Sequence, residues 1–373
     1  MVAMKLAEAQ AEQGATVGVF AYTPRPDDFA IVESIRRQAA AAEQAGHKPV
    51  QLHMVTHPGK GFEQLTARRA RAAAKELVSQ YDFAHVHAIW EPILGATARV
   101  FADAGKPYAV CPHGMLDPWS LSQKPLKKQA ALKLWVRSML DRAAFIHMLN
   151  KDEMTLVKPL KLKAKFEQIP NGVSLKEFAS PPPPGTFYAS LPALGGKRYI
   201  LFMSRLHYKK GLRLLASAFA AAAPSLPDVD LVVAGPDGGE REGFIEMIAA
   251  AGLSDRVHLT GPIYGERKLA ALVDAACFCL PSSQEGFSVA ITEALAIGTP
   301  VVVTKACHYP EVSEYDLGVE TELTTESVAQ GLKNTLARTD RAAISARAKA
   351  LIAERFNWPM VATQTLRLYA AAR

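Results

Sequence analysis

The chain has 373 residues and an ordinary composition for a globular protein, with 49% hydrophobic residues, 21% charged residues and a formal net charge of +7. Its length suits two domains. No apolar run approaches the roughly 18 residues needed to span a bilayer, and from the sequence we expect no secretory signal peptide. The four cysteines form no CxxC pair, which fits a reducing cytosol rather than a disulfide-stabilised domain.

The basic excess lies in the first half of the chain. Residues 1–180 contain 24 Lys and Arg against 17 Asp and Glu, whereas residues 181–373 contain 19 of each kind. A positive half can attract an anionic membrane surface, a polyanionic acceptor or nucleic acid. No nucleic-acid recognition motif accompanies the charge, so nucleic acid is the least favoured of these partners.

Strand and helix patterns alternate through the first half. The chain opens on a helical pattern over residues 1–13. We expect strands at residues 16–23, 49–55, 83–90, 108–112, 144–150 and 166–169, and helices at 64–80, 92–104 and 124–142. This alternation indicates α/β units around a mostly parallel sheet.

Four consecutive prolines, Pro181–Pro184, predict a stiff extended linker and hence a domain boundary. A second alternating pattern follows them. Its expected strands are residues 198–203, 230–234, 256–260, 277–281 and 300–304, and its last helix is 358–373. The predicted domains are residues 1–180 and 181–357, followed by a C-terminal helix of residues 358–373.

The stretch of residues 282–303 contains a loop, a nearly apolar helix at 288–297 and a buried strand. Gly298 and Pro300 stand where a helix stop is expected. Glu293 is the one charged residue on this helix, and burying its carboxylate requires a hydrogen-bonding partner. Glu285 lies in the loop before the helix, whose N-terminal amides form a potential anion site. A buried helix with one salt-bridged glutamate is an equally open interpretation.

Two further segments follow strand ends, where doubly wound folds bind ligands. Residues 204–211 (SRLHYKKG) carry Arg205 and Lys210, which could bind a phosphate. His113 and a glycine follow the strand at 108–112, and an imidazole there can donate to a ligand oxygen or transfer a proton. His85 and His87 share one strand face, and we expect neither to be a direct ligand.

Three other patterns carry weaker signals. The helix at 124–142 is basic and amphipathic, so it either binds a membrane surface or is a core helix with a solvated basic face. Asp228 and Asp230 form a DxD pattern at the start of a strand, the wrong end for a metal site. Cys277 and Cys279 lack accompanying ligands at metal-binding spacing. We therefore expect no metal.

Together these motifs resemble the retaining glycosyltransferases of family 4, over essentially the whole chain. The matching segments are the E-x7-E pair of Glu285 and Glu293, the SRLHYKKG loop, residues 170–173 (PNGV) and the HGMLDPWSL motif from His113, which resembles that of a recurring subgroup. The resemblance implies the GT-B fold, an α/β fold with two Rossmann-like domains facing across a cleft. It implies an acceptor-side first domain and a nucleotide-sugar-binding second domain.

The resemblance also implies roles for these residues. Glu285 would hold donor-sugar hydroxyls and Glu293 the nucleotide ribose, while His113 would lie beside the transferred sugar. Arg205 and Lys210 would neutralise the leaving diphosphate in place of a metal, so no cofactor is expected. The donor-binding residues at the helix start would be Gly286, Phe287, Ser288 and Val289. The anomeric configuration would be kept by same-face attack.

The chain departs from the family pattern at its beginning. Family members open with a strand and a glycine-rich loop, whereas this chain aligns from the following helix. Roughly 15–25 residues would be involved, judged from usual strand and turn lengths. Either the first sheet lacks a central strand, which would call activity into question, or the natural start lies upstream of Met1.

The favoured function is transfer of a sugar from a nucleotide-diphosphate sugar to a glycan or lipid-linked acceptor, in cell-envelope or exopolysaccharide biosynthesis. Such an enzyme would be cytoplasmic and could associate peripherally with the inner face of the cell membrane through residues 124–142. The alternatives are a non-enzymatic or inactive sugar-nucleotide-binding protein and a nucleotide-sugar epimerase of the same fold.

Overall fold

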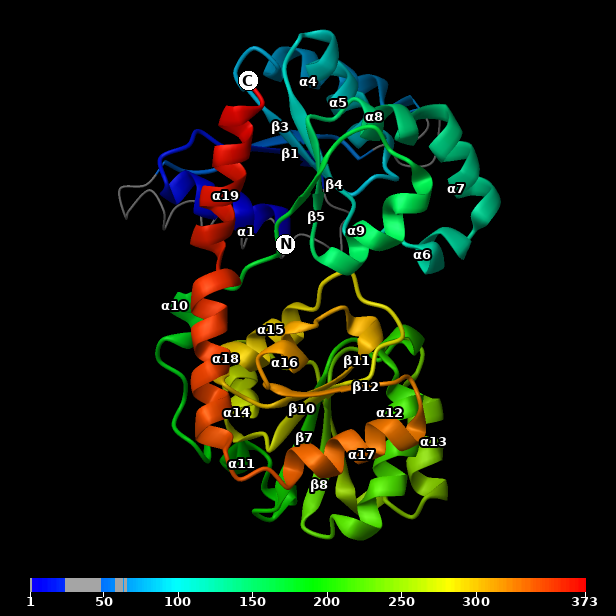
Figure 1. The fold of residues 1–373 in the computed structure, drawn as a ribbon, viewed down its shortest axis with the longest axis vertical. Coiled ribbons are helices and arrows are strands. Elements are labelled where there is room, and N and C mark those ends of the chain that lie inside the picture. Colours follow the sequence, from blue (N-terminus) through cyan, green and yellow to red (C-terminus); the bar gives the residue numbers. More distant parts are fainter. Residues whose placement is uncertain (1, 24–47, 58–62, 64–65) are drawn as a thin grey trace. The chain divides into compact units, whose positions relative to one another are not determined.

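The computed structural model describes residues 2–23, 48–57, 63 and 66–373. The chain divides into two compact units (Figure 1). The first unit consists of Met1–Asn171 with Trp358–Arg373, and the second of Gly172–Asn357. Among the described residues, no helix has both the length and the apolar character that a membrane span requires.

The second unit contains one six-stranded sheet in the order β12-β11-β10-β7-β8-β9, in which every neighbouring pair is parallel. The strands are β7 (Arg198–Met203), β8 (Val229–Ala234), β9 (Val257–Gly261), β10 (Cys277–Leu280), β11 (Val301–Thr304) and β12 (Gly318–Thr321). From β7 the chain builds outward through β8 and β9, then returns to the other side of β7 with β10. This reversal is the topological switch point of a doubly wound sheet.

Helices accompany the strands of this sheet. They are α10 (Leu175–Phe178), α11 (Thr186–Ser190), α12 (Leu212–Ala222), α13 (Arg241–Ala250), α14 (Gly265–Asp274), α15 (Val289–Ile297), α16 (Glu311–Glu314), α17 (Thr325–Leu336) and α18 (Arg341–Arg355). Every residue of β8, β10 and β11 is buried. Such continuously apolar strands are typical of parallel sheets covered on both faces.

The described strands of the first unit form two parallel sheets, one in the order β1-β2 and one in the order β3-β4-β5-β6. The strands are β1 (Gly18–Tyr22), β2 (Gln51–Val55), β3 (Ala84–His87), β4 (Tyr108–Cys111), β5 (Phe145–Met148) and β6 (Phe166–Gln168). The helices are α1 (Val2–Glu12), α4 (Arg68–Leu77), α5 (Pro92–Asp103), α6 (Pro118–Ser122), α7 (Pro125–Ala131), α8 (Arg137–Asp141), α9 (Lys151–Val157) and α19 (Trp358–Ala371).

The C-terminal helix α19 packs against the first helix, α1, within this unit (Figure 1). Gln10 of α1 donates from Nε2 to Thr365 Oγ1 at 2.8 Å and to the Tyr369 hydroxyl at 3.1 Å. Leu6 and Val361 share a buried cluster with Phe145 of β5. The first and last described helices therefore cover the same sheet.

The structure confirms every strand predicted from the sequence, most of them with shorter ends, although β8 begins at Val229 and β9 ends at Gly261, each one residue beyond the prediction. It also confirms the predicted helices at 1–13 and 358–373. The helix predicted at 64–80 begins at Arg68, and residues 64 and 65 lie outside the described residues. The strand β12 was not predicted. The strand predicted at 83–90 ends at His87 because Ala88 adopts a left-handed conformation, with φ at 75°.

The boundary between the units falls at Asn171 and Gly172 rather than at the four prolines. Phe178 and Phe187, which lie before and after Pro181–Pro184, are both buried in the core of the second unit. The prolines therefore span the surface of that unit instead of joining two bodies.

The basic helix predicted at 124–142 consists of three consecutive segments. A π-helical turn, η2 (Leu132–Val136), lies between α7 and α8. Insertions of this kind shift the side chains that follow to a different face of the helix, and they are frequent at functional sites.

Candidate functional site

The second unit brings two loops together at its switch point. The loop of residues 204–211 follows β7, and residues 281–288 follow the neighbouring strand β10. The backbone N–H of Ser283 donates to Lys209 O at 2.8 Å, and Lys209 Nζ donates to Gln284 Oε1 at 3.1 Å. Both predicted donor loops therefore meet at the carboxyl ends of adjacent strands, where this fold class binds ligands.

Gly211 permits the close approach of these loops. Its φ of +71° is left-handed, and a Cβ atom at this position would lie 1.8 Å from Pro281 O. No side chain fits there without displacing the backbone that follows β10. The final glycine of the SRLHYKKG motif thus has a structural reason.

Lys210 and Glu285 form an ion pair across the two loops, with Lys210 Nζ donating to Glu285 Oε1 at 2.6 Å. The side chains are 19% and 8% exposed. Ser282 Oγ donates to the same oxygen at 2.6 Å. Arg205 is exposed and forms no ion pair with any residue that the structure describes. One predicted cation is therefore held by a carboxylate, and the other is available to an external anion.

Glu293 has the partner that its burial requires. Lys268 of α14 donates from Nζ to Glu293 Oε1 at 2.7 Å, and both side chains are mostly buried. The Lys268 ammonium also lies 5.9 Å from the centre of the Phe178 ring. The carboxylate was expected to need a partner, and the structure supplies a lysine, as in the interpretation of a buried helix with one salt-bridged glutamate. Its assignment to the nucleotide ribose stays a prediction.

The segment that enters α15 supplies a conventional helix start. Ser288 is the N-cap, and its hydroxyl accepts from Ile291 N–H at 3.4 Å. The Phe287 ring packs 5.8 Å from Tyr309 and 6.0 Å from Phe356. Gly286 and Val289 are both partly buried. This packing fixes the path of the predicted donor-binding residues at the positive end of a nine-residue helix.

The first unit contains another predicted site residue, His113, directly after β4. Its φ is +53°, a left-handed conformation, and Gly114 follows at +71°. The buried carboxylate of Glu153 holds this turn, because Gly114 N–H donates to Oε1 and Leu149 N–H donates to Oε2, each at 2.6 Å. Glu153 thereby ties the loop after β4 to the loop after β5.

Sequence reasoning missed Glu153, although a signal was present. Asn150 and Glu153 have the N-cap spacing at which a glutamate often bonds a backbone amide near the helix start. The Asn150 side chain accepts from Glu153 N–H at 2.7 Å.

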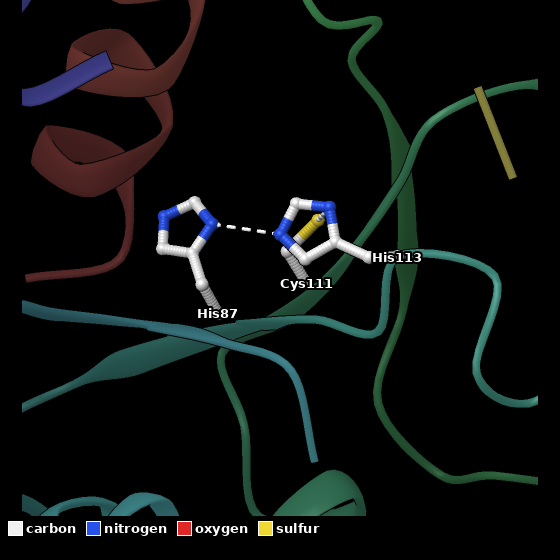
Figure 2. Close-up of side chains that lie close together, drawn as sticks. All are labelled: His87, Cys111 and His113. Carbon is white, nitrogen blue, oxygen red and sulfur yellow. Dashed lines mark hydrogen bonds between the residues drawn. The ribbon is translucent and has the colours of Figure 1, made fainter. Parts of the chain in front are cut away.

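His113 is the first of a row of four histidines, and Figure 2 shows its contact with the second, His87, beside Cys111. His87 Nδ1 lies 3.0 Å from His113 Nε2, and Cys111 Sγ lies 3.7 Å from His113 Nδ1. The rings of His85 and His87 are 4.5 Å apart, which confirms that they share a strand face. The row was not predicted, because it combines residues from three strands.

The far end of the row reaches the C-terminal helix. His85 Nε2 lies 3.2 Å from His147 Nδ1, and His85 Nδ1 lies 2.6 Å from the Tyr369 hydroxyl. His147 Nε2 lies 2.6 Å from the carbonyl oxygen of Ile169. Burial lowers the pKa of His113 and of His147 to about 4, and it lowers the pKa of His85 and of His87 well below the usual value. The four imidazoles are therefore neutral at pH 7.

The aspartates of the DxD pattern are engaged by basic side chains. Arg198 Nε donates to Asp228 Oδ2 at 2.8 Å, and Lys197 Nζ lies 3.3 Å from Asp230 Oδ1. His258 Nε2 lies 2.8 Å from Asp230 Oδ2. The pattern stands at the start of β8, away from the switch-point loops. The two aspartates therefore take part in ion pairs and hydrogen bonds within the second unit.

Two family models match the chain in succession. Residues 1–172 match the glycosyl transferase 4-like domain, and residues 187–344 match the glycosyl transferases group 1. The phosphatidyl-myo-inositol mannosyltransferase of Mycobacterium leprae is 26% identical over 249 residues, which are 65% of this chain and 62% of that protein. The D-inositol 3-phosphate glycosyltransferase of Segniliparus rotundus is 30% identical over 217 residues, which are 56% of this chain and 47% of that protein. The chain therefore spans less than two thirds of the length of these relatives.

Solved structures are similar over nearly the whole chain. Sucrose-phosphate synthase from Thermosynechococcus elongatus has a TM-score of 0.74 at 19% identity, covering 98% of this chain and 91% of that one. Anabaena HepE in complex with UDP and glucose has a TM-score of 0.70 at 17% identity, covering 95% and 100%. At these identities the likeness shows the fold.

Proposed function

Because the chain belongs to the group 1 glycosyl transferases, with the GT-B fold of two Rossmann-like units, we propose that it is a retaining glycosyltransferase. It moves a sugar from a nucleotide-diphosphate sugar to a glycan or lipid-linked acceptor. The observation that carries this proposal is that the loop with Arg205 and Lys210 contacts the loop with Glu285, which leads into α15, at the switch point of the six-stranded sheet.

The two cations of the loop at 204–211, Arg205 and Lys210, would stabilise the negative charge of the leaving diphosphate. Negative charge develops on its oxygens as the bond to the sugar breaks, and preorganised cations stabilise that charge. Arg205 is exposed at this point and Lys210 is held in place by Glu285. The amides of Gly286, Phe287 and Ser288 add the positive end of α15. We infer that these groups replace a metal ion in the reaction.

The two glutamates supply acceptors for hydroxyl groups. Lys210 and Ser282 both bond Oε1 of Glu285, and Lys268 bonds Oε1 of Glu293. A carboxylate has about four lone-pair sites over two oxygens, so each keeps acceptor capacity. We assign Glu285 to the donor sugar and Glu293, on the first turns of α15, to the nucleotide ribose.

His113 is assigned to the transferred sugar. Its imidazole is neutral at pH 7, so it adds no further positive charge. To bond a sugar hydroxyl, one ring nitrogen exchanges its contact with His87 or Cys111. The left-handed turn held by Glu153 fixes its position in the first unit. The anomeric configuration is retained by same-face attack, with no protein carboxylate as nucleophile.

The acceptor side is proposed to work at a membrane surface. Leu126 and Leu134 of the α7–η2 segment are 82% and 77% exposed, and they stand among Lys124, Lys127 and Lys133. Exposed apolar side chains with flanking lysines are suited to the surface of an anionic bilayer. The chain would then act on the cytoplasmic face of the cell membrane in cell-envelope or exopolysaccharide assembly.

The test is a panel of nucleotide-diphosphate sugars assayed for binding and hydrolysis, with and without a chelator. We expect one donor to be hydrolysed slowly and metal-independently, and Arg205→Ala to reduce that rate on the order of 100-fold. Arg213→Ala removes a cation that is paired with Glu240 outside the loops and serves as the matched control. The proposal fails if no donor binds, or if both variants behave alike.

A further inference from the structure

Three potential metal ligands meet at the carboxyl end of β4. They are His87 at the end of β3, Cys111 at the end of β4 and His113 in the turn that follows (Figure 2). One ligand atom from each lies within 4.8 Å of the other two. Among the residues that the structure describes, no other group of three histidine, cysteine or acidic side chains comes this close.

The distances are close to those of a coordination sphere. Zinc bonds of about 2.0 Å to nitrogen and about 2.3 Å to sulfur place tetrahedral ligands about 3.3–3.6 Å apart. Cys111 Sγ and His113 Nδ1 are separated by 3.7 Å, and His87 Nδ1 and His113 Nε2 by 3.0 Å. One ion takes a single nitrogen of His113, so binding requires a rotation of one imidazole and movements of about 1 Å.

The chemistry of the set selects a soft or borderline ion. Two imidazoles and one thiol suit zinc, cobalt or copper, whereas magnesium and calcium require oxygen ligands. The nearby carboxylate of Glu153 is occupied by the amides of Gly114 and Leu149. A neutral imidazole carries one nitrogen lone pair, which can bind a metal ion in place of a hydrogen-bond donor.

The remainder of the sheet supports the three side chains. Glu153 fixes the turn that carries His113. The His85 ring packs against His87 at a tilt of 31° and is itself held by His147 and the Tyr369 hydroxyl. Metal ligands in proteins are commonly oriented by such surrounding contacts.

We propose that His87, Cys111 and His113 bind one thiophilic divalent ion, such as zinc. On binding, the Cys111 S–H bond breaks, a sulfur–metal bond forms, and the proton passes to solvent. Three protein ligands leave a fourth position for water or a substrate oxygen.

The consequence for activity rests on the proposed function. The ion would occupy the imidazole that we assign to the transferred sugar, so it would act as an inhibitor and not as a cofactor. Zinc bound at His113 removes the nitrogen that the sugar hydroxyl needs. A reducing compartment that supplies free zinc would thus lower the rate of transfer through this cluster.

Cobalt titration of the full-length chain tests the site without any assay of transfer. Co²⁺ alone, added to reduced protein, is expected to saturate at one equivalent, with a sulfur-to-cobalt charge-transfer band and the visible bands of a tetrahedral ion. Zinc should displace it. One proton per ion should be released in weakly buffered solution.

Two variants and one control locate the ion. Cys111→Ala should abolish the charge-transfer band, and His87→Asn should weaken cobalt binding at least tenfold while keeping the cysteine. Cys279→Ala removes a buried thiol of the second unit and should leave the titration unchanged. A wild-type chain without the band, or a band lost in Cys279→Ala and kept in His87→Asn, overturns the site.

Inhibition is measured separately. One equivalent of zinc should reduce transfer at least tenfold in the wild-type chain, and should have no effect on the residual activity of Cys111→Ala. If the ion binds and transfer is unchanged, the inhibitory role is wrong. If no donor supports transfer, the proposed function fails, and the cobalt titration still decides the metal site.

Discussion

Lys210 Nζ lies 2.6 Å from Glu285 Oε1, although the two residues are 75 positions apart in the chain. The pair joins the loop after β7 to the loop after β10, and these two strands are neighbours in the middle of the six-stranded sheet. Each charged group therefore positions the other. A phosphate ligand and a sugar hydroxyl would find the ammonium and the carboxylate already in place, which lowers the cost of ordering them on binding.

Separate removal of either partner is expected to destabilise the second unit. Lys210→Met leaves a buried carboxylate without its cation, and the free energy of unfolding should fall by about 3 kcal/mol. The double variant Lys210→Met/Glu285→Gln should recover most of this loss while transfer stays at least 100-fold reduced. Urea denaturation and a transfer assay measure the two effects. Equal stability of the single and double variants would contradict the pairing.

Glu153→Gln tests the turn that carries His113. A carboxamide offers one acceptor atom where Glu153 uses two, so its NH₂ group must face Gly114 N–H or Leu149 N–H. We expect a loss of about 1–3 kcal/mol in unfolding free energy. Hydrogen exchange at these two amides should accelerate. Asp152→Asn, which changes the neighbouring carboxylate in the sequence, serves as the control. Unchanged exchange in Glu153→Gln would show that the carboxylate does not hold the turn.

The sequence was sufficient for most of the elements and for part of the site. An apolar run such as Val301–Val303 predicts a strand in a parallel sheet that is covered on both faces, and the structure has a buried strand there. Gly298 adopts the left-handed conformation that its position after the helix predicted. The short strand β12 has no such run: its GVET sequence contains one β-branched apolar residue. Local pattern alone gives no reason to place a strand there.

The contacts of the site could not be predicted in the same way. The pairing of Glu293 with Lys268 depends on how α14 and α15 pack, and the histidine row depends on the order of β3, β4 and β5. A sequence pattern gives the face of a strand on which His85 and His87 lie. It does not identify the neighbouring strand, and hence it does not reveal His147 or His113 as their partners.

The buried histidines predict acid sensitivity of the first unit. The pKa of His147 and of His113 is about 4 in the folded chain, below the usual value of about 6.5 in an unfolded chain. Between these values the unfolded state binds more protons, so stability is present above about pH 6.5 and is lost as the pH falls towards 4.

This acid sensitivity is checked by the pH dependence of unfolding between pH 7 and pH 4.5. His147→Asn removes one buried base, and the decline in stability over this range should become shallower. Hydrogen exchange should show earlier opening of β3 and β5 than of β8 and β10, because the histidine row lies in the first unit. An identical slope in His147→Asn would contradict its lowered pKa.

Vesicle binding tests the exposed leucines of the α7–η2 segment. Leu126 and Leu134 are the two most exposed large apolar side chains among the described residues, at 82% and 77%. Insertion of each leucine into the bilayer interface should contribute on the order of 1 kcal/mol, so replacing both with aspartate should weaken binding to anionic vesicles at least tenfold. Co-sedimentation with vesicles of phosphatidylserine and phosphatidylcholine measures this.

Leu323→Asp provides the matched control, since Leu323 is 49% exposed and belongs to the second unit. It should leave vesicle binding unchanged. Raising the salt concentration should weaken wild-type binding, because the lysines around Leu126 contribute by attraction to anionic headgroups over a distance of about 10 Å at 0.1 M salt. If the double leucine variant and Leu323→Asp sediment alike, the segment is not the membrane surface, and the acceptor must reach the first unit from solution.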